Sequence, residues 1–308
     1  MRAVIQESFG GPEVLRAVET DRPVPLGGEV LVRVRAVGVN PVDVAVRAGA
    51  LPLLGEPPFG VGWDLSGTVE EAAPGARFQP GDEVFGMPFF PRAAGGYAQY
   101  AVAPSRQVAR KPAALDHVHA AAVPLAGLTA WQGLVDAARI EEGQRVLIHR
   151  AAGGVGHLAV QIAKARGAHV IGLASAAKHD FVRGLGADEV IDHRTTDFTD
   201  VVGDLDVVLD SNADGLRSLS VLRPGGTLVT IMEHWNRELA AKVEAAGRTF
   251  AGISVEPDHA SLEALARLVD AGRVRPRIAR TFPLAEAAAA HELVGSGQVQ
   301  GKVVLTVD

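Results

Sequence analysis

The sequence of 308 residues contains no cysteine. Disulfide bridges are therefore excluded, and so is every metal site built on thiolates, including zinc fingers and iron–sulfur clusters. A metal ion would have to be held by histidine and carboxylate side chains alone. We expect no metal site in this chain.

Long apolar runs and basic runs are also missing. No stretch of about 20 apolar residues is present to cross a membrane, and Met1 leads into charged and turn residues without the apolar core of a signal peptide. The 30 Lys and Arg are outnumbered by 36 Asp and Glu, which gives a net charge of -6 and no basic run for nucleic acid or anionic lipid. These absences predict a cytoplasmic enzyme without a membrane or nucleic-acid partner.

The apolar sequence that is present suffices for two folded domains. Hydrophobic residues make up 47% and charged residues 21%, the balance of a folded globular protein, and a domain has about 150 residues. Residues 1–116 alternate short apolar and polar runs, such as 30–35 and 66–70, between turn clusters rich in proline and glycine. This pattern predicts a compact β domain.

From about residue 120 apolar strands alternate with amphipathic helices, as in parallel sheets built from βαβ units. They predict an α/β fold with a doubly wound, six-stranded parallel sheet in residues 117–259. Its expected strands are residues 145–149, 169–173, 189–191, 206–209, 227–231 and 249–254. The tail, residues 260–308, is expected to return to the first domain, with helices up to residues 271 and 293 and strands at 278–282 and 302–307.

A glycine-rich turn follows the first of these strands directly, in the sequence Ala151-Ala152-Gly153-Gly154-Val155-Gly156. The segment after it has apolar residues on one helical face, which ends at Gly167. Gly153 lets the backbone approach a pyrophosphate, Gly156 allows close packing of helix and strand, and the helix N-terminus supplies unpaired N–H groups. Although Ala151 replaces the first glycine of G-x-G-x-x-G, strand, turn and helix together predict a dinucleotide site.

The end of the second strand favours NADP(H) over NAD. In such folds an acid about 20 residues after the turn binds the ribose diol and repels a 2′-phosphate. Here the strand ends at Leu173 and no acid follows until Asp180, whereas Ser175 and Lys178 can donate hydrogen bonds to phosphate oxygens. The alternative is that Lys178 is an ordinary solvated residue.

Further motifs stand in order along nearly the whole chain: Val37-Gly38-Val39-Asn40-Pro41-Val42-Asp43, Gly62-Trp63-Asp64-Leu65-Ser66-Gly67, and residues 81–86, 95–100, 124–131, 185–192 and 301–305. With the glycine turn they resemble the medium-chain dehydrogenase/reductase superfamily, in its zinc-free quinone oxidoreductase branch, which includes zeta-crystallin. The resemblance implies a GroES-like catalytic domain of residues 1–116 and 260–308 and a Rossmann NADP-binding domain of residues 117–259. It also implies an active site in the cleft between the two domains.

The resemblance explains which metal ligands are missing. Zinc alcohol dehydrogenases of the superfamily have a Cys ligand where Asn40 stands and a His-Glu pair where Trp63-Asp64 stands. Without a Lewis acid nothing polarises an alcohol oxygen, whereas a quinone or an α,β-unsaturated carbonyl takes the charge of an incoming hydride onto its own oxygen. The resemblance therefore implies an NADPH-dependent reductase of quinones or α,β-unsaturated carbonyls that works without metal.

Family positions carried onto this sequence give the expected site residues. The predicted catalytic residues are Asn40 and Thr129, which would hold the nicotinamide and its ribose, and Asp43. The predicted pyrophosphate contacts are Gly153, Gly154, Val155 and Gly156, and the predicted 2′-phosphate end is Ser175, Lys178 and His193. Asn212, at the carboxyl end of the fourth strand, is a further predicted cofactor contact, together with Ser254 and Lys302.

Some of these positions have two interpretations. Asp43 either relays a proton or fixes its loop by hydrogen bonding, and Trp63 lines either the substrate site or the core. Arg150, where relatives often have Gly or Ala, either contacts phosphate or leaves the strand toward solvent. Some relatives have a Tyr where Ala45 stands, so the residues identify no proton donor. Tyr97 is expected to pack within its strand.

Two other functions stay open. An enoyl-thioester reductase would need a basic entry for a phosphopantetheine or CoA arm, for which the sequence offers only Arg92 and Arg106. A non-catalytic NADPH-binding protein, crystallin-like or RNA-binding, is the other alternative. Because the sixth strand would form an open sheet edge, and family members pair this edge across a twofold axis, we expect a homodimer.

Overall fold

The structure is a computed structural model that describes residues 1–308. Its internal contacts divide the chain into two compact units. The first consists of Met1–Leu128, Glu256–Ala271 and Pro276–Asp308, and the second of Thr129–Val255 and Gly272–Arg275. The expected domain limits, 1–116 with 260–308 and 117–259, stay a prediction.

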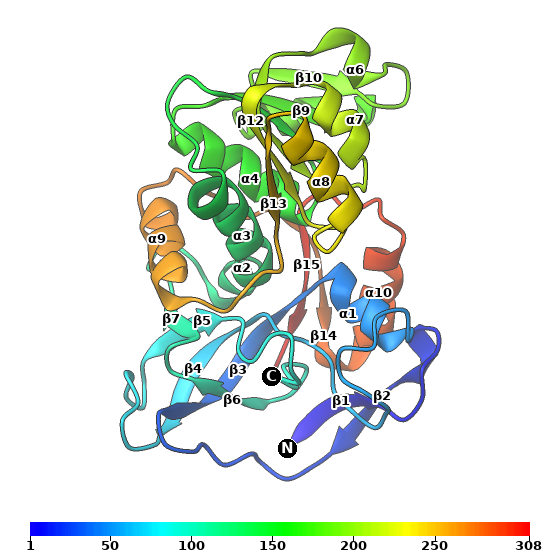
Figure 1. Cartoon of the computed structure of the whole chain (residues 1–308). Helices are drawn as coiled ribbons and strands as arrows, with labels where there is room; N and C mark the ends of the chain where they lie inside the picture. The colour runs from blue at the N-terminus through cyan, green and yellow to red at the C-terminus, as the bar shows by residue number, and fades with distance from the viewer. The chain divides into compact units, whose positions relative to one another are not determined.

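The first unit contains a seven-stranded sheet in which β14, β15, β3, β4, β5 and β7 follow one another and β6 pairs with β3 (Figure 1). A hairpin of β1 and β2 forms a separate sheet. The strands are β1 (Arg2–Gln6), β2 (Leu15–Glu19), β3 (Glu29–Val39), β4 (Leu65–Ala72), β5 (Glu83–Gly86), β6 (Tyr100–Pro104), β7 (Val108–Arg110), β14 (Ile278–Pro283) and β15 (Lys302–Thr306). The helices are α1 (Pro41–Arg47), α2 (His117–Ala121), α9 (His259–Asp270) and α10 (Ala287–Gly295), and short 3-10 helices span Pro12–Val14 and Leu284–Glu286.

The central strand of this sheet is β3, whose sequence alternates in the manner of a half-buried strand. Arg33 and Arg35 are exposed, whereas Val32, before Arg33, and Val34, between the two arginines, are buried. Its C-terminal half pairs antiparallel with β15, so the last strand of the chain lies in the sheet of the first unit. β3 is therefore held between the first and the last parts of the chain.

Small residues let α2 approach β3 and β15 closely. Ala36, Ala121, Ala122 and Val304 form a fully buried cluster at this contact. A Cβ atom built on Gly38 would lie 2.5 Å from Ala121 O and 2.7 Å from Asp64 Oδ2, closer than carbon and oxygen can approach. Glycine at this position therefore brings β3, α2 and the Asp64 side chain together.

The second unit is a six-stranded sheet of order β10-β9-β8-β11-β12-β13, in which every neighbouring pair is parallel. This confirms the predicted doubly wound parallel sheet. The strands are β8 (Arg145–Ile148), β9 (His169–Ala174), β10 (Glu189–Asp192), β11 (Leu205–Asp210), β12 (Leu222–Thr230) and β13 (Thr249–Gly252). The helices are α4 (Gly154–Ala165), α5 (His179–Gly184), α6 (Phe198–Val201), α7 (Gly215–Ser220) and α8 (Arg237–Ala245), with a 3-10 helix at Ala176–Lys178. Helix α3 (Pro124–Trp131) begins in the first unit, enters the second at Thr129 and continues into a π-helix at Gln132–Ala137.

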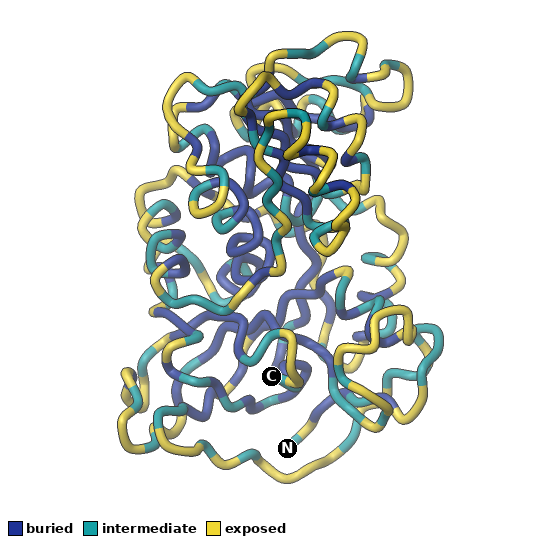
Figure 2. The backbone as a smooth tube through the Cα atoms, viewed as in Figure 1, coloured by how far each residue is buried: buried dark blue, intermediate teal, exposed yellow.

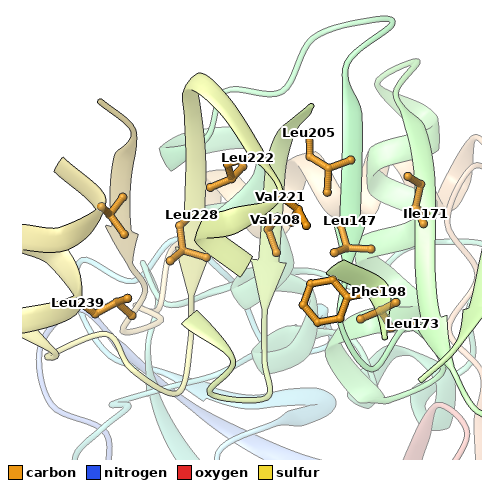
Figure 3. Packing of buried hydrophobic residues seen from close by; sticks show 11 residues of the cluster. Leu147, Ile171, Leu173, Phe198, Leu205, Val208, Val221, Leu222, Leu228 and Leu239 are labelled. Carbon is orange, nitrogen blue, oxygen red and sulfur yellow. The ribbon is translucent and has the colours of Figure 1, made fainter. Parts of the chain in front are cut away.

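The central strands β8, β9 and β11 of this sheet are buried on both faces, in the region where the tube of Figure 2 is dark blue. Apolar side chains from β8, β9, β11 and β12 form the centre of the packing on one face (Figure 3). Phe198 of α6 and Leu239 of α8 join them from the covering helices. Continuous apolar strands of this kind are typical of parallel sheets covered by helices.

Two strand boundaries differ by two or more residues from those expected. β12 begins at Leu222, five residues earlier than the expected strand, because its register with β11 shifts and accommodates Pro224 and Gly225. β13 ends at Gly252, two residues before the expected end. No helix is long and apolar enough to cross a membrane. The cytoplasmic location stays a prediction.

Candidate active site

The glycine-rich turn leads from β8 into α4. Gly153 is the N-cap of α4 and offers no side chain to its amides, and the N–H of His157 is the first that donates to a carbonyl of this turn, Gly153 O, at 3.0 Å. The amides of Gly154, Val155 and Gly156 precede it at the helix N-terminus, where backbone N–H groups lack intrahelical acceptors. This end of α4 suits an anionic group such as a pyrophosphate.

Close packing explains why glycine is needed at position 156, the last residue of the turn. A Cβ atom on Gly156 would lie 2.2 Å from Arg150 O and 2.8 Å from Ala151 Cα. Ala151 in turn donates its N–H to Leu173 O at 3.0 Å, which ties the turn to the end of β9. The alanine in place of the first glycine is therefore compatible with the turn, whereas a side chain at position 156 is not.

Three cations gather where β8, β9 and β10 end. Arg150 follows β8, Lys178 lies on the 3-10 helix after β9, and Arg194 follows β10. Burial, followed by the charges of Arg150 and Arg194, lowers the pKa of the Lys178 ammonium, so the three charges interact. One carboxylate is near: Asp192 accepts the backbone N–H of Arg194 at 3.0 Å. The predicted residues Ser175, buried, and His193, exposed, adjoin this cationic cluster.

Arg150 adopts an unusual backbone conformation. Its φ of 49° lies in the left-handed region, which costs an L-residue roughly 1–2 kcal/mol. Its side chain is exposed. Glycine would adopt this conformation without strain, whereas the arginine adds a positive charge beside Lys178.

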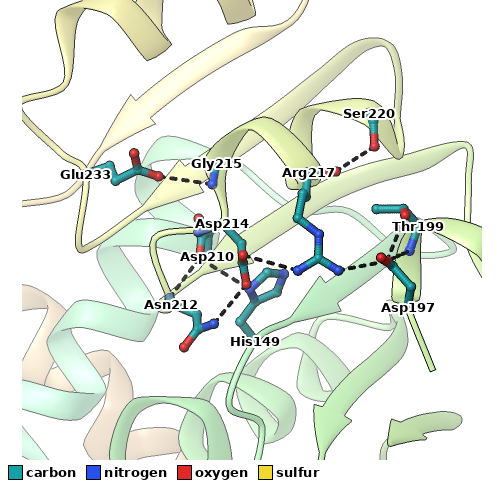
Figure 4. A network of polar contacts seen from close by, with 10 residues as sticks. All are labelled: His149, Asp197, Thr199, Asp210, Asn212, Asp214, Gly215, Arg217, Ser220 and Glu233. Carbon is teal, nitrogen blue, oxygen red and sulfur yellow. Dashed lines mark hydrogen bonds and ion pairs between the residues drawn. The ribbon is translucent and has the colours of Figure 1, made fainter. Parts of the chain in front are cut away.

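A buried polar pair lies at the carboxyl ends of β8 and β11, between which the strand order of the sheet reverses. His149 Nδ1 lies 3.2 Å from Asp210 Oδ1, but without the geometry of a hydrogen bond, so neither ring nitrogen of His149 has a hydrogen-bond partner. Asp210 accepts the backbone N–H groups of Asn212 and Asp214 at 2.8 and 2.9 Å (Figure 4). This carboxylate therefore fixes the loop that carries Asn212, at the place where α/β sheets bind ligands.

The loop is held on its other side by charged groups. Asn212 Nδ2 donates to Asp214 Oδ2 at 2.8 Å, and Arg217 bridges Asp214 to Asp197 at 3.3 and 2.7 Å (Figure 4). The Arg217 guanidinium also lies over the ring of Phe198. Asn212 itself is exposed on this fixed loop, and Ser254 is exposed beyond the end of β13, whereas Thr129 is buried in α3.

The predicted residues of the first unit lie in a buried polar cluster. Asn40 Nδ2 donates to Asp64 Oδ2 at 2.9 Å, and the Lys302 ammonium donates to Asn40 Oδ1 and, at 3.2 Å, to Asp64 Oδ2. Asp64 Oδ1 accepts the backbone N–H of Leu125 at 2.6 Å. Asn40, Asp64 and Lys302 are at most 3% exposed, so a lysine and an aspartate form an ion pair away from water.

Asp43 adjoins this cluster and leads to a second one. Its Oδ2 accepts the backbone N–H of Asn40 at 2.7 Å and lies 3.5 Å from the hydroxyl of Tyr97, which lies 3.0 Å from His291 Nε2. Burial raises the pKa of the Asp43 carboxyl to about 7, helped by the charge of Asp64 and opposed by the Asn40 N–H and Lys302. Burial also lowers the pKa of His291 to about 3, with the charge of Arg47 acting in the same direction.

These residues do not fit a catalytic zinc ion. Asn40 and Asp64 are bound to each other and to the Lys302 ammonium. The Trp63 indole is wholly buried, donates to Arg92 O at 2.7 Å and stacks edge-on against Phe90, which places it in the core. No group of three or more His, Asp or Glu side chains is arranged to hold a metal ion.

Family models match residues 27–113 as an alcohol dehydrogenase GroES-like domain and residues 185–305 as a zinc-binding dehydrogenase. The quinone oxidoreductase of Homo sapiens is 34% identical over 327 residues, which cover 99% of this chain and 97% of that protein. The structure of the quinone oxidoreductase from Coxiella burnetii matches with a TM-score of 0.94 at 35% identity, covering 100% of this chain and 99% of that one. The chain belongs to the quinone oxidoreductase family. The CurK enoyl reductase structure also matches, with a TM-score of 0.89 at 29% identity, covering 100% of this chain and 99% of that one.

Membership of the quinone oxidoreductase family confirms the resemblance and the fold class derived from the sequence. The protein is an oxidoreductase of the medium-chain dehydrogenase/reductase type, and its relatives imply a nicotinamide cofactor.

The sequence did not predict four residues of the candidate site. Arg194 lies in the cationic cluster, and Asp64, Tyr97 and His291 lie in the buried clusters of the first unit. Arg194 could have been found from its position at the end of the third strand. Tyr97 and His291 are 194 residues apart in sequence, so no local pattern relates them.

The raised pKa of Asp43 predicts a specific dependence of stability on pH. Between the unfolded value of 3.8 and the folded value of about 7 the folded chain binds the extra proton, so this contribution to stability is full at low pH and is lost as pH rises through 7. The free energy of unfolding of the wild type, measured relative to Asp43→Asn, should therefore fall by about 2 kcal/mol from pH 5 to pH 8.

Urea denaturation at intervals across this pH range measures that difference. Asp200→Asn, at an exposed carboxylate on α6, is the matched control and should follow the wild type at every pH. A constant difference between wild type and Asp43→Asn would show that Asp43 does not titrate in this window.

Proposed function

We propose that this protein is an NADPH-dependent reductase that transfers hydride to quinones or α,β-unsaturated carbonyls without a metal ion. The observation that carries the proposal is the cluster of Asn40, Asp64 and Lys302. At the positions where zinc relatives bind their metal, this chain holds an ammonium group between an amide and a carboxylate.

The acceptor class follows from the chemistry available to such a cluster. An alcohol must lose its O–H proton as it is oxidised, and without a Lewis acid its pKa stays too high for this at neutral pH. Quinones and enones instead delocalise the incoming charge onto their own oxygen. A bound dihydronicotinamide supplies the hydride, and the protein aligns donor and acceptor.

The residues of this chain then have defined tasks. Gly154, Val155 and Gly156 would bind the pyrophosphate with backbone amides, and Asn212 would contact the nicotinamide half from the loop fixed by Asp210. Asn40 and Thr129 would orient the nicotinamide and its ribose. Asp43 could hold or release a proton near neutral pH, because burial raises its pKa to about 7.

Support for NADP(H) rather than NAD comes from the cationic cluster of Arg150, Lys178 and Arg194. A 2′-phosphate at the end of β9 would meet three positive charges and the Ser175 hydroxyl group. A ribose diol has no charge to match them.

The cofactor preference should be large enough to measure directly. Because a charge-assisted phosphate contact contributes about 1.5–3 kcal/mol, NADPH should bind about tenfold to a hundredfold more tightly than NADH. Lys178→Ala should remove most of this preference, whereas Lys242→Ala, an exposed lysine paired with Glu238 on α8, should keep it. Calorimetry that finds equal or tighter binding of NADH to the wild type would refute the preference.

The reaction itself is tested by loss of reduced-nicotinamide absorbance with a panel of quinones, enones, enoyl thioesters and simple alcohols. Activity toward quinones or enones should survive a chelator, and elemental analysis should find no stoichiometric zinc. Asn40→Ala and Thr129→Val should lower turnover on the order of a hundredfold through lost alignment, with little change in NADPH affinity. Stoichiometric zinc, or oxidation of simple alcohols without reduction of any conjugated acceptor, would overturn the proposal.

An enoyl-thioester reductase is the second candidate, and the match to the CurK enoyl reductase favours it. The phosphates of a CoA or phosphopantetheine arm would need basic residues, and Arg92 and Arg106 are exposed in the first unit. If the same panel shows that enoyl-CoA is reduced faster than every quinone, this second function is the correct one. NADPH binding without turnover of any acceptor would decide for a non-catalytic role.

We further propose a homodimer formed through β13. This strand ends the order of its sheet, so one edge carries unpaired backbone groups, which a second copy can satisfy across a twofold axis. Light scattering at micromolar concentration should give twice the mass of the chain. Glu or Pro introduced at Phe250 should shift the population to monomer, and a wild-type monomer would exclude this pairing.

A further inference from the structure

The buried cluster around Asn40 fixes which way round its side-chain amide lies. Lys302 Nζ can only donate hydrogen bonds, so the atom of Asn40 that faces it must be the oxygen. Asp64 Oδ2 can only accept when ionised, so the atom that faces it must be the nitrogen, at 2.9 Å. The reversed amide would set donor against donor and acceptor against acceptor, and the ion pair of Lys302 and Asp64 therefore selects a single orientation.

This orientation leaves one N–H of Asn40 for a ligand. The amide nitrogen has two protons, of which one is donated to Asp64, and this nitrogen makes no second hydrogen bond within the protein. Asn40 is 2% exposed, so bulk water does not satisfy this proton freely. A buried donor without an acceptor is unfavourable, and an oxygen atom of a ligand would remove this penalty.

The ion pair also strengthens this donor. The positive charge of Lys302 on the amide oxygen draws electron density from the nitrogen, and such polarisation along a hydrogen-bonded chain is stronger away from water. Asp64 balances the charge of Lys302, and its second oxygen is held by the Leu125 amide at 2.6 Å. The cluster thus presents a polarised N–H group without a net charge.

We propose that the second N–H of Asn40 receives the oxygen of the electron acceptor on which negative charge develops, and that Lys302 and Asp64 are positioning residues for it. This inference rests on the proposed function. In the reaction a C–H bond of the dihydronicotinamide would break as a C–H bond forms at the carbon conjugated to the carbonyl group. A π electron pair moves to the carbonyl oxygen, and that oxygen later takes a proton from solvent. NADPH is oxidised and the acceptor is reduced.

The inference narrows the class of substrate. A donor that meets developing oxyanion charge lowers the barrier only for acceptors that place the charge on oxygen. Its hydrogen bond would stabilise negative charge on the carbonyl oxygen, as a Lewis acid does in the zinc relatives, although more weakly. Acceptors that are conjugated only to an arene leave the charge on carbon and gain nothing from it.

The test uses a probe that reports the donor without turnover. 4-Nitrophenol absorbs at different wavelengths as phenol and phenolate, so the pH at which the bound probe is half ionised can be read in the full-length chain saturated with NADP+. The charge of the oxidised cofactor acts on all variants alike, so differences between variants report the amide and the ion pair.

The ionisation constant of the probe bound to the wild type should be at least fivefold larger than that of the probe bound to variants that lack the donor or its polarisation. These are Asn40→Ala and the charge-balanced double variant Asp64→Asn with Lys302→Met. Lys302→Arg keeps the cation and should retain most of the effect. The same double variant should lower kcat with the KM for NADPH little changed.

Each outcome bears on the inference. Equal ionisation constants in the wild type, Asn40→Ala and the double variant would refute it, and so would a wild type that fails to bind the probe at millimolar concentration. If the double variant does not fold, as near-ultraviolet circular dichroism would show, Asn40→Ala decides alone, because it leaves the ion pair intact. A wild type that shifts the probe but reduces no quinone or enone would overturn the proposed function and leave the donor established.

Discussion

The ion pair between Lys302 and Asp64 is the interaction on which the first unit depends. Lys302 begins β15 and Asp64 precedes β4, and through Asn40 and Leu125 the same few atoms also reach the starts of α1 and α3. A buried charge that loses its partner typically costs 3–5 kcal/mol, a large part of the stability of a domain. The four segments are therefore held in one arrangement by a pair that is also placed at the candidate site.

The second unit depends on a steric constraint instead of a charge. The distance between α4 and the glycine turn leaves no room for a side chain at Gly156, and the turn is tied to β9 by the Ala151 amide. Farther along the same edge of the sheet, Asp210 fixes the loop after β11 with two backbone hydrogen bonds. Backbone groups thus form this part of the site, which explains why its glycine pattern is recognisable in the sequence.

The sequence predicted the six parallel strands and the last strand of the chain because apolar periodicity and turn residues are local signals. It also predicted Asn40, Lys302 and the glycine turn as site residues, although Lys302 was expected at the cofactor and the structure pairs it with Asp64. The contacts of Tyr97 with Asp43 and His291 could not be predicted, because they join the segment before β6 to α1 and α10, which are 54 and 194 residues away in sequence. The start of β12 was placed too late because Pro224 and Gly225 are typical of turns as well as of bulges.

The place of β15 in the sheet has a consequence for the order in which the chain folds. The second unit is almost one continuous segment, so all its strands have left the ribosome before synthesis ends. The first unit instead inserts its final strand between β3 and β14, the two neighbours that flank it in the sheet. Until residues 302–306 emerge, β3 has an open edge and Asp64 lacks its cation, and such non-local closure is slow and exposes the chain to aggregation. During translation the half of the protein that is made first is thus the half that is completed last.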